Sequence, residues 1–264
     1  MNYTTNIRGT LIDMGKPMVM GILNVTPDSF YAASRQQTQR GIAERTNQII
    51  AEGGAMIDVG ACSTRPGADL VDEEEEMRRL AFALPIVRRE QPDAIVSVDT
   101  FRPGVARRCV EEWGIDIIND VKGSEGMWQA VAALRVPYIY MSSKPCLHDL
   151  LIDFADVTRR LHDMGICDVI IDPGFGFGKT LDQNYRLLSE MDKLQVLRMP
   201  ILVGLSRKRM AYQLLGITPE ESLNATTALH TIALQKGANI LRVHDVREAV
   251  EATRIASQLL TMNS

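Results

Sequence analysis

The sequence predicts an α/β fold, a (β/α)8 TIM barrel built as a single domain over residues 1–264. Eight short apolar runs recur along the chain, and stretches with helical periodicity separate them. The runs are nearly continuous in Val, Ile and Leu instead of alternating, which is typical of parallel strands buried on both faces. Eight alternating strand and helix units in roughly 250 residues match the size of such a barrel. An open, doubly wound sheet is the structural alternative.

The first four expected strands are the runs "PMVMGILNV", "AMIDVG", "DAIVSVD" and "IDIIND". We place them near 18–24, 53–60, 94–99 and 115–120. The second and fourth follow a glycine that closes a helix-like stretch, in "AEGG" and "EEWG". Glycine accepts the left-handed conformation in which a helix turns back into a strand. The stretches 42–50 and 74–87 carry the helical pattern between these strands.

The last four expected strands lie near 136–142, 168–172, 200–205 and 238–243. Proline opens two of them, in "RVPYIYM" and "RMPILVG", and glycine precedes the other two, in "HDMGICDVIID" and "LQKGANILRV". The stretch 223–234 has the pattern of a helix. The acidic run 72–76 is interpreted as the solvated first turn of the second helix, where negative charge suits the helix dipole.

Composition argues against several classes of function. The formal net charge of −4 gives no electrostatic footprint for nucleic acid, so an anionic ligand requires a local basic site. The four cysteines are far apart and form no C-x-x-C pair, which suits free thiols in a reducing compartment. No run reaches the length of a membrane span, and the N-terminus lacks the pattern of a signal peptide. We therefore expect a soluble, cytoplasmic protein that binds neither nucleic acid nor membranes.

Polar residues stand at the ends of nearly all the expected strands. In such a barrel the working residues come from the carboxyl ends of the strands and from the loops that follow them. Loops begin at strand ends, so any one polar residue there has an ordinary explanation, but a set around one mouth points to a site. The set comprises Asn24, Asp58, Ser63, Thr64, Arg65, Asp99, Asn119, Asp120, Met141, Ser142, Asp172, Ser206, Arg207, Lys208, Arg242 and His244.

The charges in this set divide into two groups. Asp99, Asn119 and Asp172 suit a flat heterocycle with a guanidine-like edge, because a carboxylate accepts two parallel N–H bonds. The cations, among them Arg65 and Arg242, suit a phosphate or diphosphate. Together the groups predict a ligand in which a polar ring carries a phosphorylated group. The alternative is that the carboxylates and the cations pair with each other and only stabilise the barrel.

The stretch "IIDPGFGFGKT", residues 170–180, resembles a phosphate-binding loop but fits neither common template. A P-loop requires glycine at the position of Pro173, and a dinucleotide fingerprint requires glycine at the position of Lys179. We interpret the glycines as a sharp turn after the sixth strand, which holds Asp172 at the mouth and leaves space beside it for a flat ring. Lys179 receives no role.

Seven stretches occur in the order typical of one family. They are "MGILNVTPDSF", "STRPGA", "VSVDT", "IINDV", "IDPGFGFGK", "LVGLSRK" and "RVHDV", and they span residues 19–246. They resemble the signatures of the bacterial dihydropteroate synthases, a family with the (β/α)8 fold. The resemblance implies that the chain joins 6-hydroxymethyl-7,8-dihydropterin diphosphate to para-aminobenzoate, giving 7,8-dihydropteroate and pyrophosphate in folate biosynthesis. It also implies Mg²⁺ as the cofactor and a homodimer as the assembly.

The same resemblance implies a role for each matching residue. The pterin would bind to Asp99, Asn119, Met141, Asp172, Lys208 and Arg242. The diphosphate would bind to Asn24, Arg65, Arg242 and His244, and Asn24 would also bind the magnesium ion. Aminobenzoate would contact Pro27, Phe30, Thr64, Arg65, Pro66, Ser206 and Lys208. The residues implied to act in catalysis are Asp28, Lys208, Arg242 and His244, in a reaction where pyrophosphate leaves before the amine attacks.

Three stretches depart from the family pattern. "YAASRQQ" replaces an Asp-Gly-Gly-type turn, Cys62 replaces a glutamate, and "YMSSKPCLHD" replaces a Met-His-Met segment. Two other functions stay open at this point: a methyltetrahydrofolate–corrinoid methyltransferase-like enzyme, and a catalytically inactive pterin-binding barrel. Neither needs a diphosphate site. Arg65 and the stretches "SRK" and "RVHD" argue against the methyltransferase, and Asn24, Arg242 and His244 argue against the inactive barrel. The pocket implies that sulfonamides, as mimics of aminobenzoate, compete for it.

Overall fold

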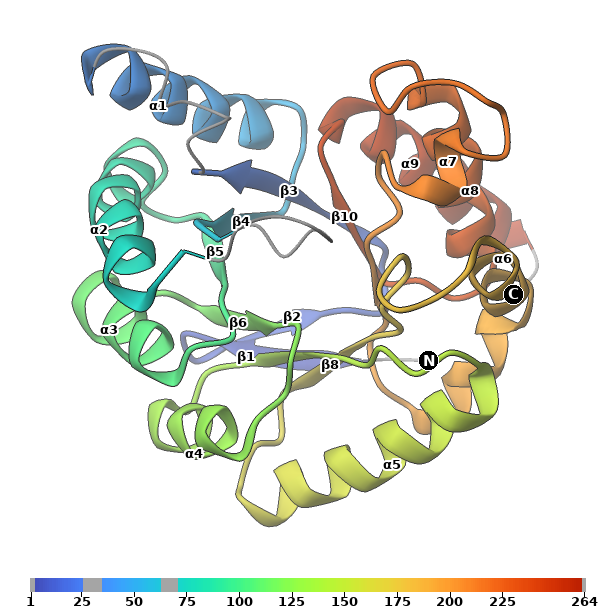
Figure 1. Ribbon diagram of the computed structural model, residues 1–264, viewed down its shortest axis with the longest axis horizontal. Helices are drawn as coiled ribbons and strands as arrows, with labels where there is room; N and C mark the ends of the chain where they lie inside the picture. The colour runs from blue at the N-terminus through green and yellow to red at the C-terminus, as the bar shows by residue number, and fades with distance from the viewer. Residues whose placement is uncertain (1–2, 26–34, 63–70, 263–264) are drawn as a thin grey trace.

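The computed structural model describes residues 3–25, 35–62 and 71–262, and these residues form the predicted barrel (Figure 1). Its eight parallel strands are β3 (Met18–Asn24), β4 (Met56–Gly60), β5 (Ile95–Asp99), β6 (Ile117–Asp120), β7 (Tyr138–Met141), β8 (Val169–Asp172), β9 (Leu202–Val203) and β10 (Ile240–Val243). Neighbouring strands follow the order β8-β7-β6-β5-β4-β3-β10-β9. A parallel bridge between Ile171 and Ile201 joins the two edges, and the Ile171 N–H donates to the Pro200 carbonyl at 3.0 Å. The sheet closes on itself, which confirms the (β/α)8 fold and excludes the open sheet.

Helices follow the strands and surround the barrel (Figure 1). They are α1 (Arg35–Ala51), α2 (Glu73–Glu90), α3 (Pro103–Trp113), α4 (Glu125–Leu134), α5 (Leu147–Asp163), α6 (Leu181–Glu190), the 3₁₀ helix η2 (Met191–Leu197), α7 (Arg209–Tyr212), α8 (Leu223–Gln235) and α9 (Val246–Met262). The glycines expected to end helices all have positive φ: Gly53, Gly114, Gly165 and Gly237. The unit after β9 is the least regular, since β9 has two residues and α7 has four. None of the described helices has the length and apolar character needed to cross a membrane.

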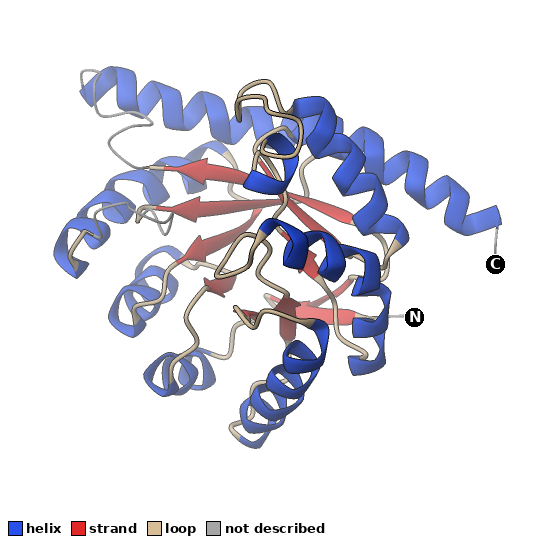
Figure 2. Cartoon of the chain, turned by 45° about the vertical axis from the view of Figure 1, so that its right-hand side comes forward, coloured by secondary structure: helices blue, strands red, loops and turns tan. Residues whose placement is uncertain are grey.

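Alternate residues of each strand face two different apolar environments. One set packs outward against the helices, in the large buried cluster that includes Val59, Val98 and Val243. The other set points into the barrel and forms a second buried cluster, which includes Met20, Met56, Ile117, Ile139, Ile170, Leu202 and Ile240. Both faces are buried, as continuous apolar runs predict. Figure 2 shows the barrel strands running toward one end of the molecule, where their carboxyl ends gather.

A hairpin that the sequence did not predict packs at the opposite, amino end of the barrel. β1 (Thr4–Ile7) pairs antiparallel with β2 (Thr10–Asp13), and both Ile7 and Met14 join the inner apolar cluster. Arg8 ties the hairpin to the barrel, since its Nη2 donates to Asp116 Oδ2 at 2.7 Å. The amino end of the interior is therefore apolar and covered, and the polar interior residues lie toward the carboxyl end.

The acidic run before α2 matches its prediction only in part. Asp72 caps the helix, because its Oδ1 accepts the Glu75 N–H at 2.8 Å. Glu76, in contrast, is fully buried and forms an ion pair with Arg102 at the start of α3. The prediction of a solvated turn was wrong for Glu76, because its partner is distant in sequence and no local pattern reveals it.

Candidate functional site

The barrel interior changes from apolar to polar two residues further along the strands. Side chains alternate along a strand, so residues two positions apart share one direction. The residues two positions after Met56, Ile117, Ile170 and Ile240 of the inner cluster are Asp58, Asn119, Asp172 and Arg242. Asp99 lies four positions after Ile95, which packs against that cluster, so the two side chains share one direction as well. The alternation that builds the apolar interior therefore also builds a polar layer at the carboxyl end.

Arg242 lies at the centre of this polar layer. Its Nε donates to Asp58 Oδ2 at 2.6 Å, and its Nη2 donates to Asp99 Oδ2 at 2.7 Å. The Asn119 amide donates to the same Asp58 oxygen at 3.2 Å. Asp58 is fully buried and acts as an internal counter-ion of the guanidinium. Part of the set thus pairs internally, as the alternative interpretation expected, and Asp58 takes its place in that network.

Burial and the crowding of charge shift the protonation of this layer. Burial raises the pKa of Asp99 to about 7; Arg242 lowers this pKa, and Asp58 raises it further. Burial alone lowers the pKa of Arg242, but Asp58 and Asp99 outweigh it and raise the pKa, so the guanidinium stays charged. Asp172 is close enough to contribute to the same effect on Arg242. Strongly perturbed carboxylates at a barrel mouth are typical of a functional site.

Asp172 ends β8 and is oriented by the glycine turn that follows it. Its Oδ1 accepts the Gly174 N–H at 2.8 Å. Gly174 has φ 64°, and a Cβ there would lie 2.4 Å from the Ser142 carbonyl oxygen and 2.6 Å from Met141 Sδ, so the position requires glycine. Met141 is buried against this turn. Burial raises the pKa of Asp172, and Lys208 opposes the shift.

Two lysines lie beside the glycine turn. Lys208 donates from Nζ to the Phe175 carbonyl at 2.6 Å. Lys179, for which the sequence suggested no role, donates to the Gly174 carbonyl at 3.0 Å and so fastens the turn. Burial lowers the pKa of each lysine to about 8, and Asp172 opposes the shift in both. The only sequence signal for Lys179 was its place directly after the glycines.

A cavity of about 230 Å³ separates the loop after β8 from the loop after β9. Three cationic side chains line it, those of Lys179, Lys208 and Arg209, and the described lining includes no carboxylate. The cavity is therefore positive and suits an anionic group. Sequence reasoning did not include Arg209, although it directly follows the "SRK" motif.

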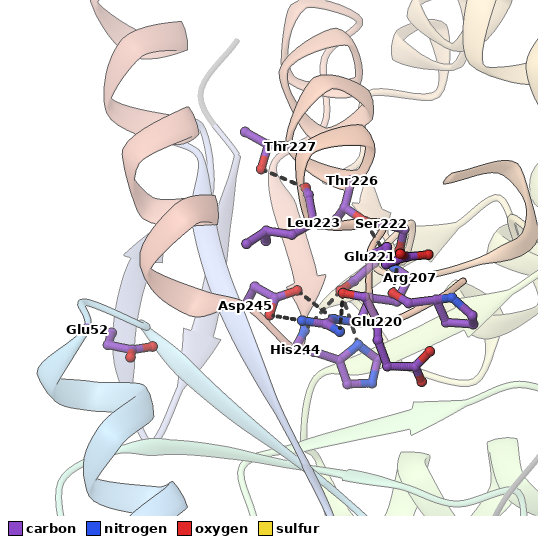
Figure 3. Close-up of polar contacts among 12 residues, drawn as sticks. Glu52, Arg207, Glu220, Glu221, Ser222, Leu223, Thr226, Thr227, His244 and Asp245 are labelled. Carbon is purple, nitrogen blue, oxygen red and sulfur yellow. Dashed lines mark hydrogen bonds and ion pairs between the residues drawn. The ribbon is translucent and has the colours of Figure 1, made fainter. Parts of the chain in front are cut away.

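Two pairs of residues join the loops after β9 and β10, and Figure 3 labels both members of the pair Arg207 and Asp245. Ser206 Oγ lies 3.1 Å from His244 Nδ1, and the His244 backbone N–H donates to the same hydroxyl at 3.2 Å. Arg207 donates from Nε and Nη2 to the two oxygens of Asp245, at 3.0 Å and 2.8 Å. The structure therefore places Ser206 and His244 side by side. Arg207, one of the cations expected to suit a phosphate, is paired with Asp245, as the alternative of internal pairing expected.

Asn24 ends β3 at the same rim and is half-buried. A Cβ on Gly60 would lie 3.5 Å from Asn24 Oδ1 and 3.8 Å from Asp99 Oδ2, and this Asp99 oxygen already accepts from Arg242. Oxygen atoms of this kind are the ligands that Mg²⁺ prefers. In the described part of the chain, no three His, Cys, Asp or Glu side chains group as a protein-only metal site would. The donors present fit an ion that takes most of its ligands from phosphate and water.

Seven residues that the sequence assigned to the site lie outside the described residues. They are Pro27, Asp28 and Phe30 of the loop after β3, and Ser63, Thr64, Arg65 and Pro66 of the loop after β4. Cys62, the last described residue before the second of these loops, is buried. Their assigned roles stay predictions.

Comparison with known proteins gives the family. The family model described as "Pterin binding enzyme" matches residues 20–244. The dihydropteroate synthase of Escherichia coli (strain K12) is 38% identical to the chain, over 96% of this chain and 95% of that protein. The dihydropteroate synthase of Bacillus subtilis (strain 168) is 34% identical, over 93% of this chain and 89% of that protein.

Solved structures show the same likeness. A Xanthomonas albilineans dihydropteroate synthase with 4-aminobenzoic acid superposes with a TM-score of 0.90 at 35% identity, covering 98% of this chain and 99% of that one. A Yersinia pestis dihydropteroate synthase in complex with a sulfonamide drug superposes with a TM-score of 0.85 at 35% identity, covering 98% and 100%. In both cases the likeness extends over 98% of this chain.

Proposed function

The chain belongs to the pterin-binding enzymes and, among them, to the dihydropteroate synthases, and from this premise we propose which residue performs each part of the reaction. The reaction is the synthase step of folate biosynthesis, in which a pterin methylene carbon exchanges its bond to diphosphate for a bond to the amine of aminobenzoate. One observation supports the assignment best. Arg242 bonds to Asp58 and Asp99, the Asn119 amide bonds to Asp58, and Asp172 lies close by, inside the barrel mouth.

The pterin ring binds in this polar layer. Asp172 offers it a carboxylate, since Oδ1 is taken by the Gly174 N–H and the described residues place no hydrogen bond on Oδ2. The aminopyrimidine edge of a pterin presents N–H donors, which a carboxylate accepts through strong, charge-assisted bonds. Asn119 and Asp99 meet the remaining polar edge of the ring, and the buried Met141 side chain provides an apolar surface beside it.

The diphosphate binds on the cationic side of the rim. Arg242 uses Nε and Nη2 in its ion pairs, which leaves Nη1 for a phosphate oxygen. His244 lies two residues after Arg242 in the sequence, and the bond to Ser206 orients its ring. Arg65 is assigned here by the sequence resemblance alone. Asn24 would hold Mg²⁺ through Oδ1, and the ion, when bound, neutralises charge on the diphosphate.

The chemistry demands a stabilised leaving group and a positioned acceptor more than a strong base. The C–O bond breaks with its electron pair leaving on pyrophosphate, the amine nitrogen of aminobenzoate supplies the pair for the new C–N bond, and that nitrogen then loses a proton. Arg242 and His244 stabilise the charge that grows on the leaving oxygen. Asp172 and Asn119 hold the ring so that the methylene carbon faces the amine.

Aminobenzoate binds at the outer side of Lys208. Relatives are known with this compound, such as the Xanthomonas albilineans enzyme, and we extend the same substrate to this chain. Ser206 and Lys208 line its place, together with the predicted contacts from Pro27, Phe30, Thr64, Arg65 and Pro66. Sulfonamides should compete there, because the Yersinia pestis relative forms a complex with a sulfonamide drug.

The assignment is tested by following pyrophosphate release and pteroate formation with purified protein, pterin diphosphate, aminobenzoate and Mg²⁺. We expect both products in equal amounts, with sulfonamide inhibition that excess aminobenzoate relieves. Pterin binding without product would support the inactive barrel, and methyl transfer from methyltetrahydrofolate to a corrinoid would support the methyltransferase. A cytoplasmic location and a homodimer are retained as predictions from the sequence, and light scattering on the eluting protein tests the second.

A further inference from the structure

Two loops at the mouth are fastened to each other by Arg207 and Asp245 (Figure 3). Nε and Nη2 of Arg207 donate to separate oxygens of Asp245, at 3.0 Å and 2.8 Å, which is the paired geometry that makes an arginine–carboxylate bridge directional. The Arg207 backbone N–H donates to Thr226 Oγ1 at 3.2 Å, and Nη1 donates to the Glu220 carbonyl at 3.3 Å. One side chain thus joins the loop after β9 to the loop after β10 and to the segment that leads into α8.

Arg207 itself has an unfavourable backbone conformation. The Lys208 N–H donates to the Leu205 carbonyl at 3.3 Å, which closes a tight turn with Ser206 and Arg207 at its centre. The φ of Arg207 is 53°, in the left-handed region, and the third position of such a turn normally takes glycine or asparagine when its φ is positive. The cost for an L side chain corresponds to about a five- to thirtyfold bias toward other conformations. Something must hold the residue there, and the contacts of its side chain do so.

The conformation of residue 207 decides where its neighbours point. Ser206 meets His244, and Lys208 reaches the Phe175 carbonyl beside the glycine turn, while Arg207 between them points to Asp245. Rotation of residue 207 to negative φ would turn the two flanking side chains relative to each other. Ser206 and Lys208 both contact substrate in the proposed site. A substitution at Arg207 would therefore alter substrate binding although Arg207 itself does not touch a substrate.

We propose that Arg207 is a positioning residue, whose two-bond pair with Asp245 holds the turn at residues 205–208 so that Ser206 and Lys208 face the substrates together. This inference rests on the site proposed above. The backbone next to Asp245 has a separate contact. Arg45 of α1 donates from Nη2 to the carbonyl of His244, the residue before Asp245, at 2.5 Å. The Asp245 side therefore has its own support, and Arg207 is the element that transmits its position to the turn.

The test compares Arg207→Ala with Arg207→Gly in steady-state kinetics. Alanine removes the pair and disfavours positive φ, whereas glycine removes the pair but accepts positive φ without strain. We expect Arg207→Ala to lower kcat/KM for aminobenzoate by about tenfold or more, through a raised KM as well as a lowered kcat. Arg207→Gly should retain about fivefold more activity than Arg207→Ala, since it avoids the conformational cost. A loss of folded enzyme alone would lower kcat and leave both KM values unchanged.

Asp245→Asn weakens the same pair from the other side and keeps the shape of the aspartate side chain. It therefore provides an independent test if the Arg207 variants misfold. It should change the same kinetic constants in the same direction, and the double variant with Arg207→Ala should lose no more than Arg207→Ala alone, because the two residues act as one unit. Multiplied losses in the double variant would overturn the proposal. Equal activities of Arg207→Ala, Arg207→Gly and the parent enzyme would also overturn it.

Two further variants separate this inference from the proposed site. Arg159→Ala removes an exposed pair on α5, in which Arg159 bonds to Asp156 at 3.0 Å, and it should leave the kinetics unchanged. Lys208→Met tests the assignment of Lys208 to substrate. If Lys208→Met is fully active, the proposed site is wrong and the inference is wrong with it. If Lys208→Met is impaired while Arg207→Ala is not, only the positioning role is wrong.

Discussion

Replacing Asp172 by asparagine tests the pterin pocket most sharply, because the structure determines how the new amide must turn. Oδ1 of Asp172 accepts the Gly174 N–H at 2.8 Å. An asparagine keeps that bond only if its oxygen takes the same place. Its NH₂ group then points where Oδ2 now offers an acceptor to the pterin, and a donor meets a donor.

The magnitude follows from the bonds that are lost. A hydrogen bond between an ionised and a neutral partner contributes about 1.5–3 kcal/mol, and a buried donor left unsatisfied costs about 1–3 kcal/mol. Together they give roughly 3 kcal/mol or more, which is about a hundredfold in Kd or greater. Turning the amide over would restore an acceptor to the ligand but would set the NH₂ group against the Gly174 N–H, so neither orientation escapes the cost.

Isothermal titration of 6-hydroxymethylpterin, which lacks the diphosphate, measures this loss without interference from the rest of the reaction. We expect binding to fall at least about a hundredfold while the Tm of the ligand-free protein changes by only a few degrees. Asp182→Asn is the matched control, since Asp182 is an exposed aspartate in the first turn of α6, and it should bind as the parent does. A Kd within threefold of the parent value for Asp172→Asn would show that Asp172 Oδ2 accepts no hydrogen bond from the pterin.

Three other predictions follow from the same contacts. Arg242→Lys keeps a cation but cannot bridge Asp58 and Asp99 as a guanidinium does, so it should weaken binding of the pterin diphosphate about tenfold more than binding of the free pterin; equal losses in titrations of the two ligands would contradict this. Burial raises the pKa of Asp99 from 3.8 to about 7, so the folded state holds a proton that the unfolded state has released, and stability should fall as pH rises through this range. Urea unfolding measures this effect. Between pH 5 and 7 the free energy of unfolding of the parent should fall by about 1 kcal/mol per pH unit relative to that of Asp99→Asn, and the same pH dependence in both proteins would contradict the prediction. Gly174→Ala adds a Cβ 2.4 Å from the Ser142 carbonyl at a φ of 64°, which should cost about 2 kcal/mol and lower the Tm by roughly 5 °C, whereas an unchanged Tm would mean that the turn is not constrained.

The fold was predictable because its signal is local. Continuous apolar runs mark strands buried on both sides, and all eight runs contain a strand of the barrel, from β3 at Met18–Asn24 to β10 at Ile240–Val243. Glycine caps mark where helices end, and Gly53, Gly114, Gly165 and Gly237 have positive φ. The hairpin of β1 and β2 escaped prediction because both of its strands carry exposed residues and lack the continuous apolar run that marks the barrel strands.

The candidate site was predictable as a set of residues but not as a set of partners. Strand ends gave Asp99, Asn119, Asp172 and Arg242, because a barrel gathers them at one rim. Which carboxylate pairs with which cation depends on contacts between residues far apart in sequence, such as Asp58 with Arg242 and Arg207 with Asp245. The sharp turn after β8 was predictable from the glycine spacing, since Gly174, Gly176 and Gly178 have positive φ, whereas the bond from Lys179 that fastens the turn has no signal in the sequence.

A crystal structure with bound pterin diphosphate and Mg²⁺ tests the central claim most directly. We expect the aminopyrimidine edge to lie within hydrogen-bonding distance of Asp172 Oδ2, the ring to lie beside Asn119 and Met141, and the diphosphate to contact Arg242 and His244. A pterin ring bound outside the barrel interior, with Asp58, Asp99 and Arg242 keeping only one another as partners, would contradict it.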